Sequence, residues 1–355
     1  QPLSVPLREP FVIASARIDA TRAALVSLEL VDEPSGRVAM GYGEAAALPP
    51  VTREDQPDLL VALAQAADVL VGRSLERYDA IDELLYRAFD GKPVARAALE
   101  SAWLDAWARL AGVPLCTLLS NRRPRSLVTD ITLPIAPAEN MAALAVAYRA
   151  REFRVFKVKV GKQLEDDVRA LQRVHARVPD ARFRLDANGG FSADDALALL
   201  ARAASSGLAI ECFEQPCARE DLDGMARVAR EGGVPIIADE SVRDLADLEQ
   251  VIALRAAHGV NLKLAKSGGL LAALALGERA RSHGLQVMCG GMVETRLGMS
   301  AMAHVACALS EVEYIDLDTA FLLAEERFVG GYRDRGPQLE LTGGPGLDVE
   351  PIATR

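Results

Sequence analysis

The spacing of apolar and polar residues predicts two regions of different structure. Residues 22–45, RAALVSLELVDEPSGRVAMGYGEA, alternate apolar and polar side chains on both sides of an EPSG turn, which predicts an antiparallel hairpin. Residues 55–110 read as helices, the last with an apolar stripe that includes Ala97, Leu104 and Leu110 and a stop at Gly112. Strands followed by helices predict a separate α+β domain, which we place at residues 1–122.

From about residue 127 the pattern changes to short β-like runs that alternate with amphipathic segments rich in Ala and Leu. The runs are TDITLPI, FRVFKVKV, FRLDA, AIECFEQP, PIIADE, VNLKLA, LQVMCGG and VEYIDL. Eight runs separated by about one helix each predict an α/β fold, a (β/α)8-type barrel over residues 123–320. A doubly wound sheet is the alternative, but it normally uses fewer strands and one switch point. The Gly- and Pro-rich tail, 321–355, is expected to pack back on the first domain.

Charged residues recur near the ends of these runs, where barrel enzymes keep their catalytic groups. Lys157 and Lys159 are two apart on one run and therefore share a face of the strand. Carboxylates end the next three runs: Asp186, Glu214 and Asp239. Lys263 lies on the run after those. Each step is about one βα unit long, so these groups are expected at similar height on successive strands.

This arrangement has a chemical interpretation. If TDITLPI is the first strand, Lys159 lies on the second and Lys263 on the sixth, which face one another across an eight-stranded barrel. Three oxygen ligands leave about half of an octahedral shell for water and substrate, which suits Mg²⁺. A lysine on each side could act as acid or base toward one carbon, with a pKa lowered by neighbouring cations. Lys266 is expected to face away or to leave the strand.

Each group also has a structural explanation. A single carboxylate at a strand end is usually a helix cap or an ion-pair partner, and a Lys-x-Lys pair is usually a solvated face. Three acids and two lysines recurring at unit spacing are harder to explain in this way. A buried cluster of like charges is costly unless a cation and ammonium groups offset it.

The motifs KVKVG, LDANGGF, FEQP, ADES, NLKLAKSGG and GGMVETRLG occur in this order along the chain. With them the sequence resembles the enolase superfamily, in its muconate-lactonizing subgroup, and especially the dipeptide epimerases. The resemblance implies a modified (β/α)7β barrel with an N-terminal capping domain. It also implies one Mg²⁺ per subunit on the three strand-end carboxylates, which stabilises an enediolate. Lys157 would lie beside the substrate carboxylate, with Lys159 and Lys263 acting from opposite faces.

One segment departs from the resemblance. LLSNRRPRS, residues 118–126, replaces a Gly-Gly pair that such proteins often carry. We expect this difference to affect a linker and not the chemistry.

The substrate is predicted from residues outside this set. Asp316 and Asp318 in VEYIDLDTAF resemble the Asp-x-Asp pair with which dipeptide epimerases hold the substrate's α-ammonium group; capping of the next turn is the structural alternative. Such a pair would repel a muconate dianion. Arg17 in PFVIASARID is expected to meet a distal substrate carboxylate by a bidentate contact. Arg296 is another candidate anionic contact, and Thr132 could bond a substrate oxygen.

We therefore predict a dipeptide epimerase acting on L-Ala-D/L-Glu by two-base 1,1-proton transfer. The alternatives within the family are an o-succinylbenzoate synthase, an N-acylamino acid racemase and a muconate cycloisomerase. A catalytically dead barrel that acts as a binding protein is the alternative outside enzymes. It predicts missing catalytic residues, and none of those named above is missing.

Composition narrows the partners and the compartment. A net charge of -10 over 355 residues argues against nucleic acid, and no apolar run is long enough for a membrane span. No signal peptide is visible at the start, and the five cysteines show no CxxC spacing, so we expect reduced thiols in a cytoplasmic protein. The four histidines lack metal-ligand spacing. By analogy with such barrels we expect a homo-oligomer.

Overall fold

The computed structural model describes residues 1–352, and its chain begins with a three-stranded antiparallel sheet. The strands are β1 (Pro2–Val12), β2 (Arg17–Asp32) and β3 (Arg37–Ala47). β2 and β3 pair without interruption from Arg22–Ala47 to Asp32–Arg37, around a turn in which Gly36 has a φ of 69°. The predicted hairpin is confirmed.

Five helices follow this sheet: α1 (Gln56–Ala64), α2 (Ala66–Leu70), α3 (Ala80–Ala88), α4 (Pro93–Ala111) and α5 (Leu115–Ser120). α4 begins with a proline at its first position and ends at Gly112 in the left-handed conformation, the predicted stop. Its backbone lies directly on β3. A Cβ at Gly41 or Gly43 would come within 2.0 Å of a carbonyl oxygen of α4, so only glycine permits this approach.

α4 is buried around most of its circumference, whereas its sequence pattern predicts a single apolar stripe. The reason is that α4 lies between β3 on one side and the rest of the molecule on the other. The guanidinium of Arg96 donates to the carbonyl of Gly268 at 2.7 Å, and the buried Glu100 accepts the backbone N–H groups of Leu270 and Leu271. α4 thus connects the N-terminal domain to the segment that follows Lys263.

The second region is an eight-stranded parallel sheet whose strands are neighbours in chain order. The strands are β5 (Ile131–Leu133), β6 (Val155–Lys159), β7 (Arg182–Asp186), β8 (Ala209–Glu214), β9 (Ile236–Ala238), β10 (Gly259–Leu262), β11 (Gln286–Cys289) and β12 (Tyr314–Ile315). The sheet curls so that its first and last strands meet, and the backbone N–H of Asp130 donates to the carbonyl of Ile315 at 3.3 Å. The predicted α/β barrel is confirmed.

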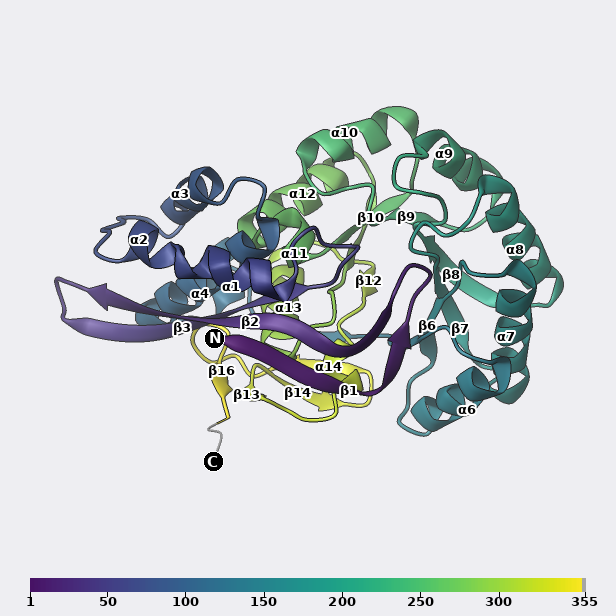
Figure 1. The fold of residues 1–355 in the computed structure, drawn as a ribbon, viewed down its shortest axis with the longest axis horizontal. Coiled ribbons are helices and arrows are strands. Elements are labelled where there is room, and N and C mark those ends of the chain that lie inside the picture. The colour runs from purple at the N-terminus through teal and green to yellow at the C-terminus, as the bar shows by residue number, and fades with distance from the viewer. Residues whose placement is uncertain (353–355) are drawn as a thin grey trace.

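The barrel helices cover the outside of this sheet, and in Figure 1 α6 to α10 form an outer arc around the strands. They are α6 (Ala138–Arg149), α7 (Leu164–Arg177), α8 (Ala193–Ser205), α9 (Leu222–Glu231), α10 (Leu245–Leu254), α11 (Leu264–Ser267), α12 (Leu270–Ser282) and α13 (Arg296–Ala308). Ser192, Asp221 and Asp244 cap α8, α9 and α10 through their side chains, so each helix begins where the sequence supplies an acceptor.

The interior of the barrel is layered. Cys212, Ile237, Met288 and Tyr314 form a small apolar cluster of their own. Three of these residues lie two positions before a carboxylate, Glu214, Asp239 or Asp316, and side chains two apart in a strand share a face. The apolar layer therefore supports a charged layer nearer the carboxyl ends of the strands.

The C-terminal residues close the structure with α14 (Thr319–Leu322), β13 (Phe328–Gly330), β14 (Tyr332–Arg335), β15 (Gln338–Leu341) and β16 (Val349–Pro351). β15 also pairs with β4 (Ser126–Val128), which the predicted boundaries place in the barrel domain. The segment contacts the N-terminal domain through the Ala324 N–H, which donates to the Pro6 carbonyl, and through the Leu347 N–H, which donates to Asp105.

Two further properties concern the whole of residues 1–352. No helix in this range combines the length and the apolar character that a membrane crossing needs. The five cysteines are buried and none is paired in a disulfide.

Candidate active site

A small pocket of about 30 Å³ lies at the mouth of the barrel, between the two regions. From the N-terminal domain it is lined by Phe11, Ile13, Leu48 and Val51. From the barrel it is lined by Thr132, Lys157, Lys159, Asn188, Lys263, Gly291, Met292, Val293, Asp316, Asp318 and Thr319. The predicted lysines Lys157, Lys159 and Lys263 thus line one pocket.

Lys157 and Lys159 both point into the barrel from β6, as their spacing predicts. The Nζ atom of Lys157 lies 2.7 Å from Glu214, 2.7 Å from Asp316 and 3.1 Å from Asp186. The Lys159 ammonium group donates to Asp186 Oδ2 at 2.5 Å. Lys157 is only 2% exposed, so its ammonium group depends on these carboxylates for stabilisation.

Lys263 follows β10, four strands from β6 in the eight-stranded sheet. Its Nζ atom lies 2.6 Å from Asp239 and 3.8 Å from Glu214. Lys266 leaves the strand, as expected, but it does not face away from the site. The chain turns into α11 directly after Lys263, which brings the Lys266 Nζ atom to 2.7 Å from Asp239 Oδ1.

Asp186, Glu214 and Asp239 form the strand-end cluster, between Lys159 and Lys263. Burial opposes ionisation of all three, but Lys159 and Lys157 hold the pKa of Asp186 below its ordinary value. In the same way Lys263 and Lys266 outweigh burial and hold the pKa of Asp239 well below its ordinary value. Burial and repulsion from Asp186 raise the pKa of Glu214 to about 7. The cluster therefore concentrates negative charge that only neighbouring cations stabilise.

The lysine pKa values follow from the same contacts. Burial lowers the pKa of Lys263, but attraction to Asp239 and Glu214 is larger and raises it above its ordinary value. The lowered lysine pKa that the sequence interpretation requires is therefore absent for Lys263 while these carboxylates pair with it.

The chemistry of the strand-end cluster suits a hard divalent cation, although its three carboxylates do not meet the 4.8 Å spacing found for another acid group of the barrel. Its members are buried carboxylates on rigid strands, and oxygen donors are what Mg²⁺ prefers. Glu214 Oε2 and Asp239 Oδ1 are buried, and each lies 2.7 Å from a lysine ammonium group. Asn261 donates to the other Glu214 oxygen at 2.8 Å, which fixes the orientation of that carboxylate.

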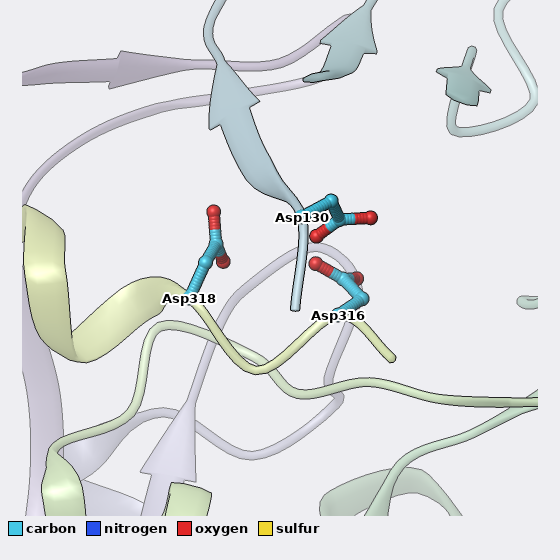
Figure 2. Close-up of side chains that lie close together, drawn as sticks. All are labelled: Asp130, Asp316 and Asp318. Atoms are coloured by element: carbon cyan, nitrogen blue, oxygen red, sulfur yellow. The ribbon is translucent and has the colours of Figure 1, made fainter. Parts of the chain in front are cut away.

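A second set of acids, Asp130, Asp316 and Asp318, forms the closing cluster, where β5 and β12 meet. Figure 2 shows the carboxyl groups of Asp130 and Asp316 pointing toward one another, with Asp318 beside them. One carboxylate oxygen from each lies within 4.8 Å of the others, a geometry that could also hold a metal. Two cations already meet this cluster: Arg184 donates to Asp130 at 2.8 Å and Lys157 to Asp316 at 2.7 Å.

The protonation of the closing cluster differs from that of the strand-end cluster. Burial and repulsion from Asp316 raise the pKa of Asp130 well above its ordinary value, and the same causes raise the pKa of Asp318 to about 6. Lys157 outweighs burial at Asp316 and lowers its pKa. Two of its three acids have raised pKa values, against one in the strand-end cluster, so the closing cluster suits a divalent cation less well.

Three other predicted residues lie differently. Thr132 lines the pocket on β5, and its backbone N–H donates to Asp318 Oδ2 at 2.5 Å. Arg17 does not line the pocket; its side chain is 62% exposed and pairs with Asp19 at 3.2 Å. Arg296 lies outside the pocket and pairs with Glu326 at 2.7 Å, since its position at the start of α13 faces the C-terminal segment.

Sequence reasoning missed several polar residues of the site. Asn261 lies two positions before Lys263 in NLK, so strand alternation could have revealed it. Asn188 follows Asp186, adopts a φ of 44°, and its side-chain oxygen lies 3.4 Å from Lys159 Nζ. Asp130 and Arg184 gave no comparable signal, because Asp130 precedes β5 and Arg184 lies on β7, and no local pattern shows that these two segments meet.

The fold and the site together define a barrel protein with opposed lysines around a carboxylate cluster, capped by an α+β domain. The family model "Mandelate racemase / muconate lactonizing enzyme, N-terminal domain" matches residues 3–120, and "Enolase C-terminal domain-like" matches residues 140–354. The chain belongs to the enolase superfamily, as its motifs predict.

The similar proteins include several epimerases. An L-Ala-D/L-amino acid epimerase of Populus trichocarpa is 38% identical, over 98% of this chain and 82% of the relative. The structure of a substrate-liganded L-Ala-D/L-Glu epimerase from Bacillus subtilis has a TM-score of 0.94 at 33% identity, covering 100% of this chain and 98% of the other. A dipeptide epimerase from Enterococcus faecalis, complexed with Mg and L-Leu-L-Tyr, has a TM-score of 0.90 at 31% identity over 98% and 97%.

Proposed function

We propose that this protein is a dipeptide epimerase, an isomerase that inverts the α-carbon next to the carboxylate of a dipeptide such as L-Ala-D/L-Glu. The observation that carries the proposal is the placement of Lys159 and Lys263. Both line one pocket, from strands on opposite sides of the barrel, with the strand-end cluster between them. A substrate carbon between two such groups can lose its proton to one lysine and regain it from the other.

In this proposal the strand-end cluster holds Mg²⁺, which supplies positive charge for the substrate carboxylate when bound. Lys157 adds a second positive charge at the bottom of the pocket. Negative charge moves onto the carboxylate as the α-proton leaves, and fixed positive charge in a buried site stabilises it more than water would. Lys159 and Lys263 hold and return the proton.

Asp316 and Asp318 would bind the α-ammonium group of the dipeptide. Both line the pocket, and Asp318 Oδ1 is buried without a hydrogen-bond donor. An ammonium group has the donors that such an oxygen lacks. This role favours a dipeptide over an N-acylated amino acid, whose nitrogen carries no charge, and over a muconate dianion.

The test is α-proton exchange in D₂O with Mg²⁺, followed by proton NMR. L-Ala-L-Glu and other L-Ala dipeptides should lose the α-proton signal of the second residue and accumulate the second diastereomer. N-succinyl amino acids and o-succinylbenzoate precursors are the comparison substrates. Exchange of N-succinyl amino acids without exchange of any dipeptide contradicts the proposal, and exchange of neither supports the binding-protein alternative.

A further inference from the structure

The part of the pocket contributed by the N-terminal domain is apolar. Phe11 and Ile13 come from the end of β1 and the loop after it, and Leu48 and Val51 come from the loop after β3. Figure 1 shows the β1–β2 connection extending toward the barrel strands. Met292 and Val293, after β11, are the other large apolar residues that line the pocket. We call Phe11, Ile13, Leu48 and Val51 the apolar wall.

The apolar wall is held in place by backbone contacts. The Ile13 N–H donates to the Ala16 carbonyl at 3.0 Å, and the Ile135 N–H of the barrel donates to the Val12 carbonyl at 2.9 Å. The Leu48 N–H donates to the Thr52 hydroxyl at 2.8 Å. Because both loops are fixed, the wall is a preformed surface that needs little ordering on binding.

The proposed function determines which part of a dipeptide would meet this wall. Of the groups around the reacting α-carbon, the carboxylate faces the strand-end cluster. The amide side leads toward Asp316 and Asp318, and the proton lies on the axis between Lys159 and Lys263. Because these directions are taken, the side chain of the reacting residue must point out of the barrel, toward the apolar wall. When the α-carbon is inverted between the opposed lysines, the carboxylate, the amide and the side chain keep their directions, and only the proton changes sides.

The charged residues of the pocket also favour an apolar substrate side chain. Its cationic lining residues are Lys157, Lys159 and Lys263, and each pairs with a carboxylate of the barrel. Arg17, the cation expected to meet a distal carboxylate, is exposed and paired with Asp19. A glutamate side chain directed at the wall would lose water without gaining a cation, whereas an apolar side chain would bury its surface there.

We propose that the protein prefers dipeptides whose second residue carries an apolar side chain, and that Ile13 and Leu48 set this preference. The proposal rests on the proposed function and narrows its substrate class. L-Ala-L-Glu remains a substrate but is turned over less efficiently than L-Ala-L-Leu.

The experiment compares kcat/KM for L-Ala-L-Leu, L-Ala-L-Gln and L-Ala-L-Glu by exchange in D₂O with saturating Mg²⁺. Gln matches Glu in size without the charge, so the series separates polarity from charge. We expect Leu to exceed Glu by about tenfold or more, with Gln between them. A Leu-to-Glu ratio below ten overturns the inference while leaving the proposed function intact. Loss of exchange with all three dipeptides, by contrast, is a failure of the proposed function.

Variants then assign the preference to the wall. Ile13→Arg should lower the Leu-to-Glu ratio by about tenfold, because a cation now faces the substrate side chain. Ser15→Arg is the matched control: it adds the same charge to the same loop at an exposed residue outside the pocket lining, and the ratio should stay at the wild-type value. Equal ratios in both variants overturn the assignment. Leu48→Arg, at a half-buried position, provides the same test if Ile13→Arg does not fold.

Discussion

The strand-end cluster and the closing cluster each contain three buried acids, and both contact Lys157, yet they differ in charge and surroundings. In the strand-end cluster Lys157, Lys159, Lys263 and Lys266 lie within ion-pair distance of three carboxylates. The closing cluster has Lys157 and Arg184 for its three acids, and its pKa values for Asp130 and Asp318 are raised.

The difference shows that proximity of acids alone does not identify a cation site. In the closing cluster, burial and repulsion from Asp316 raise the pKa values of Asp130 and Asp318 and so disfavour three full charges. In the strand-end cluster lysines hold the pKa values of Asp186 and Asp239 below their ordinary values, and only Glu214 has a raised pKa. We therefore propose that the strand-end cluster holds the divalent cation and that the closing cluster binds the substrate ammonium group.

The largest effect is expected from removing the bases beside the strand-end cluster. Lys159→Ala and Lys263→Ala should each lower epimerisation by about 10²- to 10⁴-fold, because proton transfer loses one partner. Each variant should still exchange the α-proton of one diastereomer, from the side on which the remaining lysine lies. NMR in D₂O measures both quantities. Lys162→Ala, an exposed lysine on the same segment, is the control. Full epimerisation in either alanine variant rules out two-base transfer.

The next largest effect is expected on Mg²⁺ affinity, which should differ between variants of the two clusters. Glu214→Gln should weaken Mg²⁺ binding by about a hundredfold or more, whereas Asp130→Asn should leave it within a few-fold of wild type. Isothermal titration of the protein with MgCl₂ measures this without any substrate. The wild-type protein should also gain thermal stability with Mg²⁺, by about 2.7 kcal/mol at a hundred times its Kd. The reverse pattern, with affinity lost in Asp130→Asn only, would move the cation to the closing cluster.

A smaller effect is expected from the closing cluster in substrate binding. Asp318→Asn should lower kcat/KM for L-Ala-L-Leu by about tenfold to a hundredfold, since a buried charge pair is lost. The same substitution should change kcat/KM for N-acetyl-L-Ala-L-Leu much less, because that substrate has no ammonium group. Equal losses for both substrates would mean that Asp318 has only a structural role.

The smallest effect concerns stability against pH. The folded pKa of Asp318 is raised to about 6, so its protonated form favours the fold. That contribution is complete below about pH 4 and is lost as the pH rises through about 6. Asp318→Asn should therefore gain stability relative to wild type between pH 4.5 and pH 8, on the order of 2 kcal/mol. Urea unfolding in EDTA at both pH values measures the change. Asp19→Asn, at an exposed acid, should show no such gain.

Much of this comparison could be predicted from the sequence. Strand alternation put Lys157 and Lys159 on one face, and the βα repeat put Asp186, Glu214 and Asp239 at one height. Both inferences hold because the direction of a strand side chain is set by its position within its own strand. Strand alternation also predicted the hairpin at residues 22–45, and the preference of glycine for the left-handed conformation predicted the end of α4 at Gly112.

Only the tertiary structure decided which residues from distant segments meet. Asp130 reaches Asp316 because the barrel closes between β5 and β12, and Lys266 reaches Asp239 because the chain turns into α11. The apolar wall comes from loops that lie about a hundred residues or more before the lysines they face, and no local periodicity sets the position of a loop. The sequence by itself thus determined the chemical groups at the strand ends, while long-range packing decided their partners and the surface that faces the substrate.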